Sequence, residues 1–202
     1  MACGFVLVGG ESRRMGEDKA RLVVEGRPMA LHQAAKLEKV CGRAALVGKG
    51  EDPFPGSGFP FVNDGVAEPA SLHGVAAALA WSTEELNLIL AADIPRCPEE
   101  FLAALLALAR TLGAPVVVPT SCGEMQTLCA VWRKGALVAV REAIAAGRLS
   151  VRRPIERLGG IVLSEQETAA MPGGGAESFL NVNRPEDYEE LAREATPHPP
   201  GR

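Results

Sequence analysis

The feature that most constrains the fold is an alternation of short, almost wholly apolar runs with longer helical patterns. The apolar runs are GFVLV, RAALVG, NLILAAD and APVVVP, at residues 4–8, 43–48, 87–93 and 114–119. Runs of this length without polar alternation are typical of strands buried on both faces of a sheet. Strand, helix and strand in repeated succession form a mainly parallel sheet. We therefore predict a three-layer α/β fold, with helices on both faces of the sheet.

The helical patterns occupy residues 28–40, 71–82 and 98–113. The last of them begins with proline and two glutamates, carries apolar residues at helical spacing, and stops at Gly113. Proline and acidic residues favour the first turn of a helix, and glycine favours its end. This segment is therefore predicted to be a helix, and LCAVWR, residues 128–133, a further strand.

Two segments interrupt the alternation. Residues 51–61 are rich in proline and glycine, and residues 168–178 contain three successive glycines, so both are predicted to be surface loops. No repeat and no linker divides the chain. We expect one domain over residues 1–195 and a disordered tail over residues 196–202.

Composition excludes several classes of function. Of the 202 residues, 47% are apolar and 23% charged, and the net charge is −4, so neither a nucleic-acid partner nor a membrane partner is expected. No apolar segment approaches the roughly 20 residues that span a bilayer. The cysteines are odd in number, scattered and never in a C-x-x-C pair, which favours a reduced, cytoplasmic protein in which they act as small hydrophobic residues. They are Cys3, Cys41, Cys97, Cys122 and Cys129.

A charged, glycine-rich segment follows directly on the first predicted strand. GGESRRMG begins at Gly9, where that strand should end, and Lys19 follows shortly after it. Glycines let a backbone approach a ligand closely, free N–H groups bind anions, and ligands of parallel sheets bind where strands lead into helices. The spacing fits neither the Walker loop nor the dinucleotide fingerprint. The segment is predicted to bind phosphate, although a tight turn with a solvated charged face is an alternative.

The segment LVGGESRRMGEDKARL closely resembles the signature of the molybdenum cofactor guanylyltransferases, the MobA family. The family pattern runs approximately L-x-G-G-x-S-x-R-M-G-x-D-K-x-x-L. Three later stretches, GRPM, LAADIP and FLNVNRPEDYEEL, are similar to the family's turn, metal-binding strand end and closing segment. The double glycine resembles the guanylyl branch, because the molybdopterin cytidylyltransferases usually have alanine and glycine there.

The resemblance implies a Rossmann-like nucleotidyltransferase fold and a reaction, the transfer of GMP to the phosphate of molybdopterin. GTP and molybdopterin, or the molybdenum cofactor, would be the substrates, and Mg²⁺ the cofactor. Transient contacts with other cofactor-biosynthesis proteins or recipient apoenzymes would follow. Two rival functions remain open, since fold alone does not choose among them: cytidylyl transfer to molybdopterin or a sugar-like phosphate, and nucleotide binding without catalysis.

The resemblance also implies site residues. Asp93 would hold the metal, and it follows an apolar run that places it at a strand end; an acidic cap for the next helix is the alternative. Arg14 and Lys19 would neutralise charge on the triphosphate, and these two with Asp93 form the expected catalytic set. The expected nucleotide contacts are Leu7, Val8, Gly9, Gly10, Ser12, Arg14, Lys19, Asp64 and Asp93.

Other assignments keep an alternative. Asp64 lies in an Asn-Asp-Gly sequence that also predicts a turn. Asn181, Asn183 and Gln126 would face the acceptor, although Asn183 could instead shape the turn before a helix that begins at Pro185.

One stretch departs from the family pattern. ASLHG, residues 70–74, replaces the glycine-proline-leucine-x-glycine turn of many members. Ser71 is expected to cap the following helix, and His73 to be a surface or packing residue.

Overall fold

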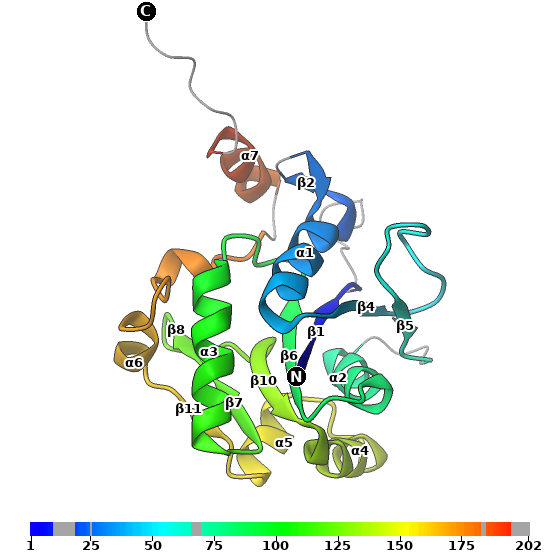
Figure 1. The fold of residues 1–202 in the computed structure, drawn as a ribbon, viewed down its shortest axis with the longest axis vertical. Helices are drawn as coiled ribbons and strands as arrows, with labels where there is room; N and C mark the ends of the chain where they lie inside the picture. Colours follow the sequence, from blue (N-terminus) through cyan, green and yellow to red (C-terminus); the bar gives the residue numbers. More distant parts are fainter. Residues whose placement is uncertain (10–18, 25, 66–69, 183–184, 195–202) are drawn as a thin grey trace, which may run out of the picture.

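A seven-stranded sheet forms the centre of the molecule in the computed structural model, which describes residues 1–9, 19–24, 26–65, 70–182 and 185–194 (Figure 1). The strand order is β11-β7-β10-β6-β1-β4-β5. All pairs are parallel except the two that β10 makes, with β6 and β7. The strands are β1 (Ala2–Leu7), β4 (Ala44–Gly48), β5 (Phe61–Asn63), β6 (Leu86–Ala91), β7 (Val116–Val118), β10 (Cys129–Arg133) and β11 (Ile161–Val162).

Helices cover both faces of this sheet, as predicted. One apolar cluster joins the sheet to α1 (Met29–Cys41) and α3 (Glu99–Leu112). A second joins the opposite face to α2 (Ser71–Trp81), α4 (Leu137–Ala145) and α5 (Arg152–Arg157). The three-layer α/β architecture is confirmed. Smaller elements are η1 (Lys19–Arg21), the hairpin β2 (Val23–Val24) and β3 (Arg27–Pro28), the hairpin β8 (Thr120–Ser121) and β9 (Glu124–Met125), η2 (Lys134–Ala136), α6 (Glu165–Ala169), η3 (Ala176–Phe179) and α7 (Pro185–Glu194).

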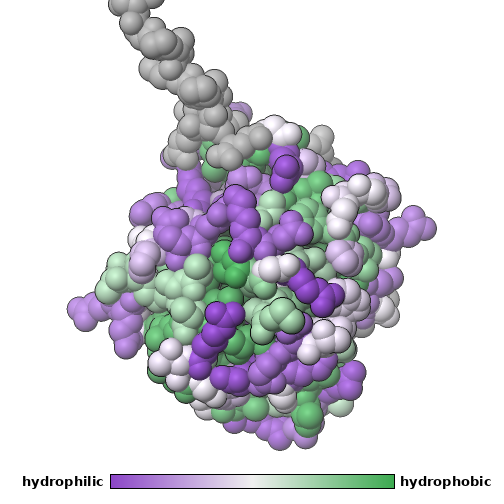
Figure 2. Space-filling model, in the orientation of Figure 1, coloured by the Kyte–Doolittle hydropathy of each residue, from purple (hydrophilic) through white to green (hydrophobic). Residues whose placement is uncertain are grey.

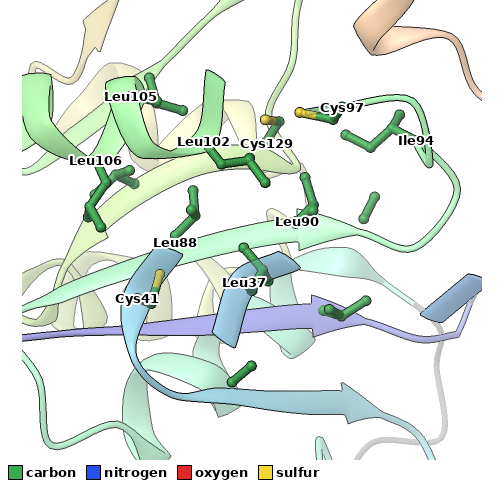
Figure 3. Close-up of a cluster of buried hydrophobic side chains, with 14 of the residues drawn as sticks. Leu37, Cys41, Leu88, Leu90, Ile94, Cys97, Leu102, Leu105, Leu106 and Cys129 are labelled. Atoms are coloured by element: carbon green, nitrogen blue, oxygen red, sulfur yellow. The ribbon is translucent and has the colours of Figure 1, made fainter. Parts of the chain in front are cut away.

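The apolar runs became central strands because successive side chains of a strand point to opposite faces. In β6, Leu88 and Leu90 belong to the first cluster and Ile89 to the second, and all three are fully buried. Figure 3 shows Leu88 and Leu90 packed below Leu102 of α3. Both faces of the sheet must therefore be apolar, and the continuous hydrophobic pattern follows.

The prediction that residues 168–178 form a loop is wrong in part, because both ends of this region are helical. Thr168 and Ala169 complete α6, and the final residues of the region form most of η3. Ser164 caps α6 through a reciprocal pair of hydrogen bonds with Glu167. This capping box has the sequence pattern S-x-x-E and lies just before the region. The loop prediction rested on the glycines and did not take the capping box into account.

The helix α7 packs away from the main sheet, against the β2–β3 hairpin (Figure 1). Val182 and Leu191 are buried with Val24 and Met29 in a small third cluster. The Tyr188 hydroxyl donates a hydrogen bond to the carbonyl oxygen of Val23 over 2.9 Å. The end of the described chain is thereby joined to the segment that follows η1.

Hydrophilic side chains surround and interrupt the hydrophobic areas on the face of the molecule that Figure 2 shows. Within the described ranges, no helix is both long and apolar enough to cross a membrane.

Candidate functional site

Several of the predicted site residues follow parallel strands at one edge of the sheet. β1 lies between β4 and β6 and is parallel to both, so their carboxyl ends share this edge. The N–H of Asp64 donates to the carbonyl oxygen of Gly48 over 2.9 Å, and that of Ala92, next to Asp93, to Leu7 over 3.3 Å. Backbone bonds between neighbouring strand ends thus place Asp93 near the end of β1, and Asp64 beside the end of β4, the next strand of the sheet.

The end of β1 approaches its neighbours closely. A Cβ on Gly48 would lie 2.1 Å from the carbonyl oxygen of Val8, so only glycine lets β4 pass there. The Val8 side chain is buried in the core, and Leu7 packs against Gly74 of α2. The Val8 side chain is therefore not available to a ligand at this end of β1. Gly9 is exposed and has φ +135°, a conformation that side-chain-bearing residues rarely adopt.

Asp93 lies in a turn two residues beyond β6 and is half-buried. Its carbonyl oxygen accepts a hydrogen bond from the N–H of Val182 over 2.8 Å. The capping alternative is not supported, because the N-cap residue of α3 is Pro98. The Val182 bond instead brings the closing segment, including the exposed Asn181, beside Asp93.

Two side chains of α1 hold the turn that carries Asp93. Gln33 donates through Nε2 to the carbonyl oxygen of Ile94 over 2.8 Å. Lys36 donates through Nζ to the carbonyl oxygens of Pro95 and Cys97, over 2.6 and 2.9 Å. The sequence interpretation missed both residues. The sequence did contain one sign of Gln33, because it is a glutamine at a position of the helix where apolar residues are expected. Its partner, the carbonyl oxygen of Ile94, could not be inferred from the sequence.

Gln126 lies at the same edge, before β10, but its side chain has local partners. Its Nε2 donates to the carbonyl oxygens of Ser121 and Glu124, each over 3.3 Å, and so holds the β8–β9 turn. Leu128, two residues later, accepts a bond from the N–H of Ala91 over 2.7 Å. Gln126 thus lies near the end of β6, and its side-chain N–H groups are engaged within the β8–β9 hairpin.

The Asn-Asp-Gly sequence forms the predicted turn. The N–H of Gly65 donates to Oδ1 of Asn63 over 2.8 Å, and Asn63 donates through Nδ2 to Gly50. Asp64 within the turn is half-buried. The turn and a ligand contact are compatible, because Asn63 rather than Asp64 makes the turn.

The ASLHG stretch differs from expectation at Ser71. Ala70, not Ser71, is the N-cap residue of α2, and it makes no side-chain capping bond. The α2 helix therefore begins one residue too early for the serine to cap it. His73 is buried and is a packing residue.

Part of the predicted site falls outside the described residues: Gly10, Ser12, Arg14 and Asn183. Lys19 begins η1, and only its backbone is described. The guanidinium of Arg21, in the same turn, lies 5.9 Å from the ring centre of Phe54. The proline- and glycine-rich segment after β4 thus reaches the segment that follows the signature.

The buried thiols are poor nucleophiles. Burial raises the pKa of Cys3 and raises that of Cys41 to about 12. A hydrogen bond with Cys97, together with burial, raises the pKa of Cys129 well above its usual value. The sulfurs of Cys97 and Cys129 face each other in Figure 3. Cys122, in the β8–β9 turn, is the exposed exception to the predicted core role.

Across the described residues, no three side chains of histidine, cysteine, aspartate or glutamate gather as a metal cage. Two half-buried aspartates and an exposed glycine follow strands at the carboxyl ends of the parallel part of the sheet, which is where α/β proteins bind their ligands. Sequence comparison identifies the family. Residues 4–166 match the family described as the MobA-like NTP transferase domain, and the chain belongs to it.

One relative agrees with this membership, and two solved structures share the fold. A probable molybdenum cofactor guanylyltransferase of Pelotomaculum thermopropionicum is 33% identical over 92% of this chain and 89% of its own. The molybdopterin-guanine dinucleotide biosynthesis protein A of Archaeoglobus fulgidus has a similar structure, with TM-score 0.79 and 22% identity over 96% and 98% of the two chains. The 2-C-methyl-D-erythritol 4-phosphate cytidylyltransferase of Thermus thermophilus shares the fold, with TM-score 0.70 and 17% identity over 95% and 97%.

Proposed function

We propose that this protein is a molybdenum cofactor guanylyltransferase. It transfers GMP from Mg-GTP to the terminal phosphate of molybdopterin, or of the molybdenum cofactor, with release of pyrophosphate and formation of the guanine dinucleotide cofactor. The observation that carries the proposal is the match of residues 4–166 to the MobA-like family, in a chain whose Asp93 follows β6 and whose Asp64 follows β5, at the carboxyl ends of parallel strands.

The residues beyond β6 fit a magnesium ion. Mg²⁺ prefers oxygen ligands and is commonly held by one or two carboxylates together with substrate phosphates and water. Asp93 supplies a half-buried carboxylate, and the exposed Asn181 lies one residue from the Val182 N–H that binds Asp93. When bound, the ion screens the charge of the triphosphate and of the leaving pyrophosphate.

The remaining work of the protein is to align two anions that repel each other. Oxygen of the acceptor phosphate forms a bond to the α-phosphorus of GTP while the bond to pyrophosphate breaks. In the proposed site Lys19 and Arg14 stabilise the charge of the phosphates, and N–H groups of the glycine-rich segment that follows Gly9 bind their oxygens. Asn181, Asn183 and Gln126 are proposed on the acceptor side. Positioning and electrostatics of this kind supply most of the catalysis of phosphoryl-type transfer.

Guanine is the proposed base. Gly9 is exposed and has φ +135°, and as a glycine it has no side chain of its own to cover its backbone. Its N–H and C=O groups are therefore accessible to the edge of a purine. A site whose polar groups pair with one base leaves them unpaired with another and rejects it strongly.

A competition assay tests the proposal. The protein is incubated with molybdopterin, Mg²⁺ and equimolar GTP, CTP and ATP, and the dinucleotide products are identified by mass. A predominantly guanine product is expected. A predominantly cytosine product would contradict the guanylyl assignment, and GTP-dependent thermal stabilisation without any product would indicate a nucleotide-binding protein that does not catalyse transfer.

A further inference from the structure

We propose that Gln33 is a positioning residue for Asp93, with Lys36 as its auxiliary. Neither side chain reaches the substrates in this proposal. They act by fixing the backbone of the turn that presents the Asp93 carboxylate. The proposal rests on the function proposed above, in which Asp93 binds the metal of the nucleotide.

The first support is that hydrogen bonds hold the Asp93 backbone on both sides. The N–H of the preceding residue, Ala92, donates to Leu7 of β1. The Asp93 carbonyl accepts from Val182 over 2.8 Å, and the next carbonyl, that of Ile94, accepts from Gln33 over 2.8 Å. The bond to the Asp93 carbonyl fixes the peptide plane directly after the Asp93 Cα, the bond to the Ile94 carbonyl fixes the next plane, and the Ala92 bond anchors the chain before Asp93. Together they limit the directions that the Asp93 side chain can take.

The second support is that Gln33 is an expensive residue to bury. It is 0% exposed, between the core residues Ala30, Ala34 and Leu37 of the same helix. Its Oε1 has no hydrogen-bond partner among the described residues. Burying a polar amide costs free energy of folding, and a buried oxygen without a protein partner calls for an explanation. The bond that its Nε2 makes to the Asp93 turn supplies one.

The third support is that Lys36, about one helical turn after Gln33, donates to the same turn. Lys36 contacts two more carbonyls of the same turn, those of Pro95 and Cys97. The α1 helix thus holds three carbonyls of one short segment. Figure 3 shows the other side of that segment, where Ile94 and Cys97 face the core beside Leu90. The turn is held by apolar packing on one side and by α1 on the other.

The location of α1 gives this arrangement a function. The helix follows the signature segment through η1 and the β2–β3 hairpin, and the N–H of Met29, its first residue, donates to Leu22 over 2.7 Å. One rigid helix therefore connects the end of the proposed triphosphate-binding segment to the proposed metal-binding turn. Mutations of residues that orient metal ligands typically lower metal affinity or activity about 10- to 100-fold.

The experiment compares three variants with the wild type. Gln33→Met keeps the side-chain volume and removes the donor, Lys36→Arg keeps a donor of the same charge, and Lys39→Met is the matched control on α1. Lys39 is exposed and contacts Glu99, away from the turn. The measurements are kcat and KM for GTP, the Mg²⁺ concentration at half-maximal rate, binding of Mn²⁺ in the presence of GTP by electron paramagnetic resonance, and the melting temperature.

For Gln33→Met we expect a fall of about 10- to 100-fold in kcat or in the affinity for Mn²⁺ with GTP. The melting temperature should change by only a few degrees, because the lost bond is offset by loss of the unpaired Oε1. Lys36→Arg should retain most activity and Lys39→Met all of it. A change below threefold in both kcat and Mn²⁺ binding for Gln33→Met would overturn the proposal, and so would a loss of activity that merely follows a large fall in melting temperature.

This result is separable from failure of the proposed function. If the wild type prefers another nucleotide, the same ratios are measured with that nucleotide. If it transfers none, the Mn²⁺ binding of wild type and Gln33→Met still decides whether Gln33 positions the metal-binding turn.

Discussion

The backbone N–H of Val182 donates a 2.8 Å hydrogen bond to the carbonyl oxygen of Asp93, and this contact joins the last part of the described chain to the end of a central strand. Asn181 thereby comes beside Asp93 although the two are remote in sequence. The contact connects the proposed acceptor side to the proposed metal ligand.

Asp93→Asn should abolish most turnover and leave the fold intact. The amide retains an oxygen but not the charge that holds a divalent cation, so we expect a fall of about 100-fold or more in kcat/KM for GTP. The measurements are the guanylylation rate and the melting curve. Glu156→Gln, which removes a surface carboxylate paired with Arg152, serves as the control. Near-normal activity in a well-folded Asp93→Asn protein would exclude Asp93 as a principal metal ligand.

Replacement of either Lys19 or Arg14 by alanine should weaken binding of the transition state. The loss of one preorganised charge costs roughly 2–4 kcal/mol, which corresponds to roughly 30- to 1,000-fold in kcat/KM. Arg27→Ala, an exposed cation in the nearby hairpin, controls for the general loss of positive charge. If both Lys19→Ala and Arg14→Ala lose less than threefold, the charged segment is a solvated face instead of a phosphate-binding loop.

Gly48→Ala should destabilise the protein. Its Cβ would lie 2.1 Å from the carbonyl oxygen of Val8, so the ends of β1 and β4 must separate. Overpacking of this kind costs about 1–3 kcal/mol, and each kcal/mol lowers the melting temperature of a chain of this size by roughly 2–4 °C. Gly135→Ala is the matched control, since its Cβ would meet nothing within 4 Å and its φ is not positive. Equal melting temperatures for the two variants would refute the steric argument.

The cysteines should differ sharply in reactivity. Only Cys122 is exposed, and the burial that raises the pKa of Cys41 to about 12 also keeps reagent away from it. Brief treatment of the native protein with iodoacetamide at about pH 8 should therefore modify Cys122 alone. Mass spectrometry locates the adduct, and all five cysteines should react after unfolding. Rapid modification of Cys41 in the native protein would contradict the packing described for α1.

Much of the fold was predictable because local patterns are sufficient for it. The continuous apolar run NLILAAD predicted a strand buried on both faces, and β6 is such a strand. The segment from Pro98 to Gly113 predicted α3 to within one residue at each end. Capping depends on the residue at which a helix begins, and that residue is set by packing. For this reason the expected cap at Ser71 was wrong and the capping box at Ser164 was missed.

The candidate site also has a part that the sequence predicted and a part that only the structure showed. By itself the sequence determined the alternation of strands and helices and the resemblance to one family, and with these the expectation that Asp93 follows a strand. Only the tertiary structure decided that Val182 binds the Asp93 carbonyl, that Gln33 and Lys36 hold the same turn, and that Gln126 is occupied by its own hairpin. The physical reason is that apolar periodicity reports which face of an element is buried. A hydrogen bond between distant segments depends instead on how those elements are placed against one another, and no local pattern records that placement.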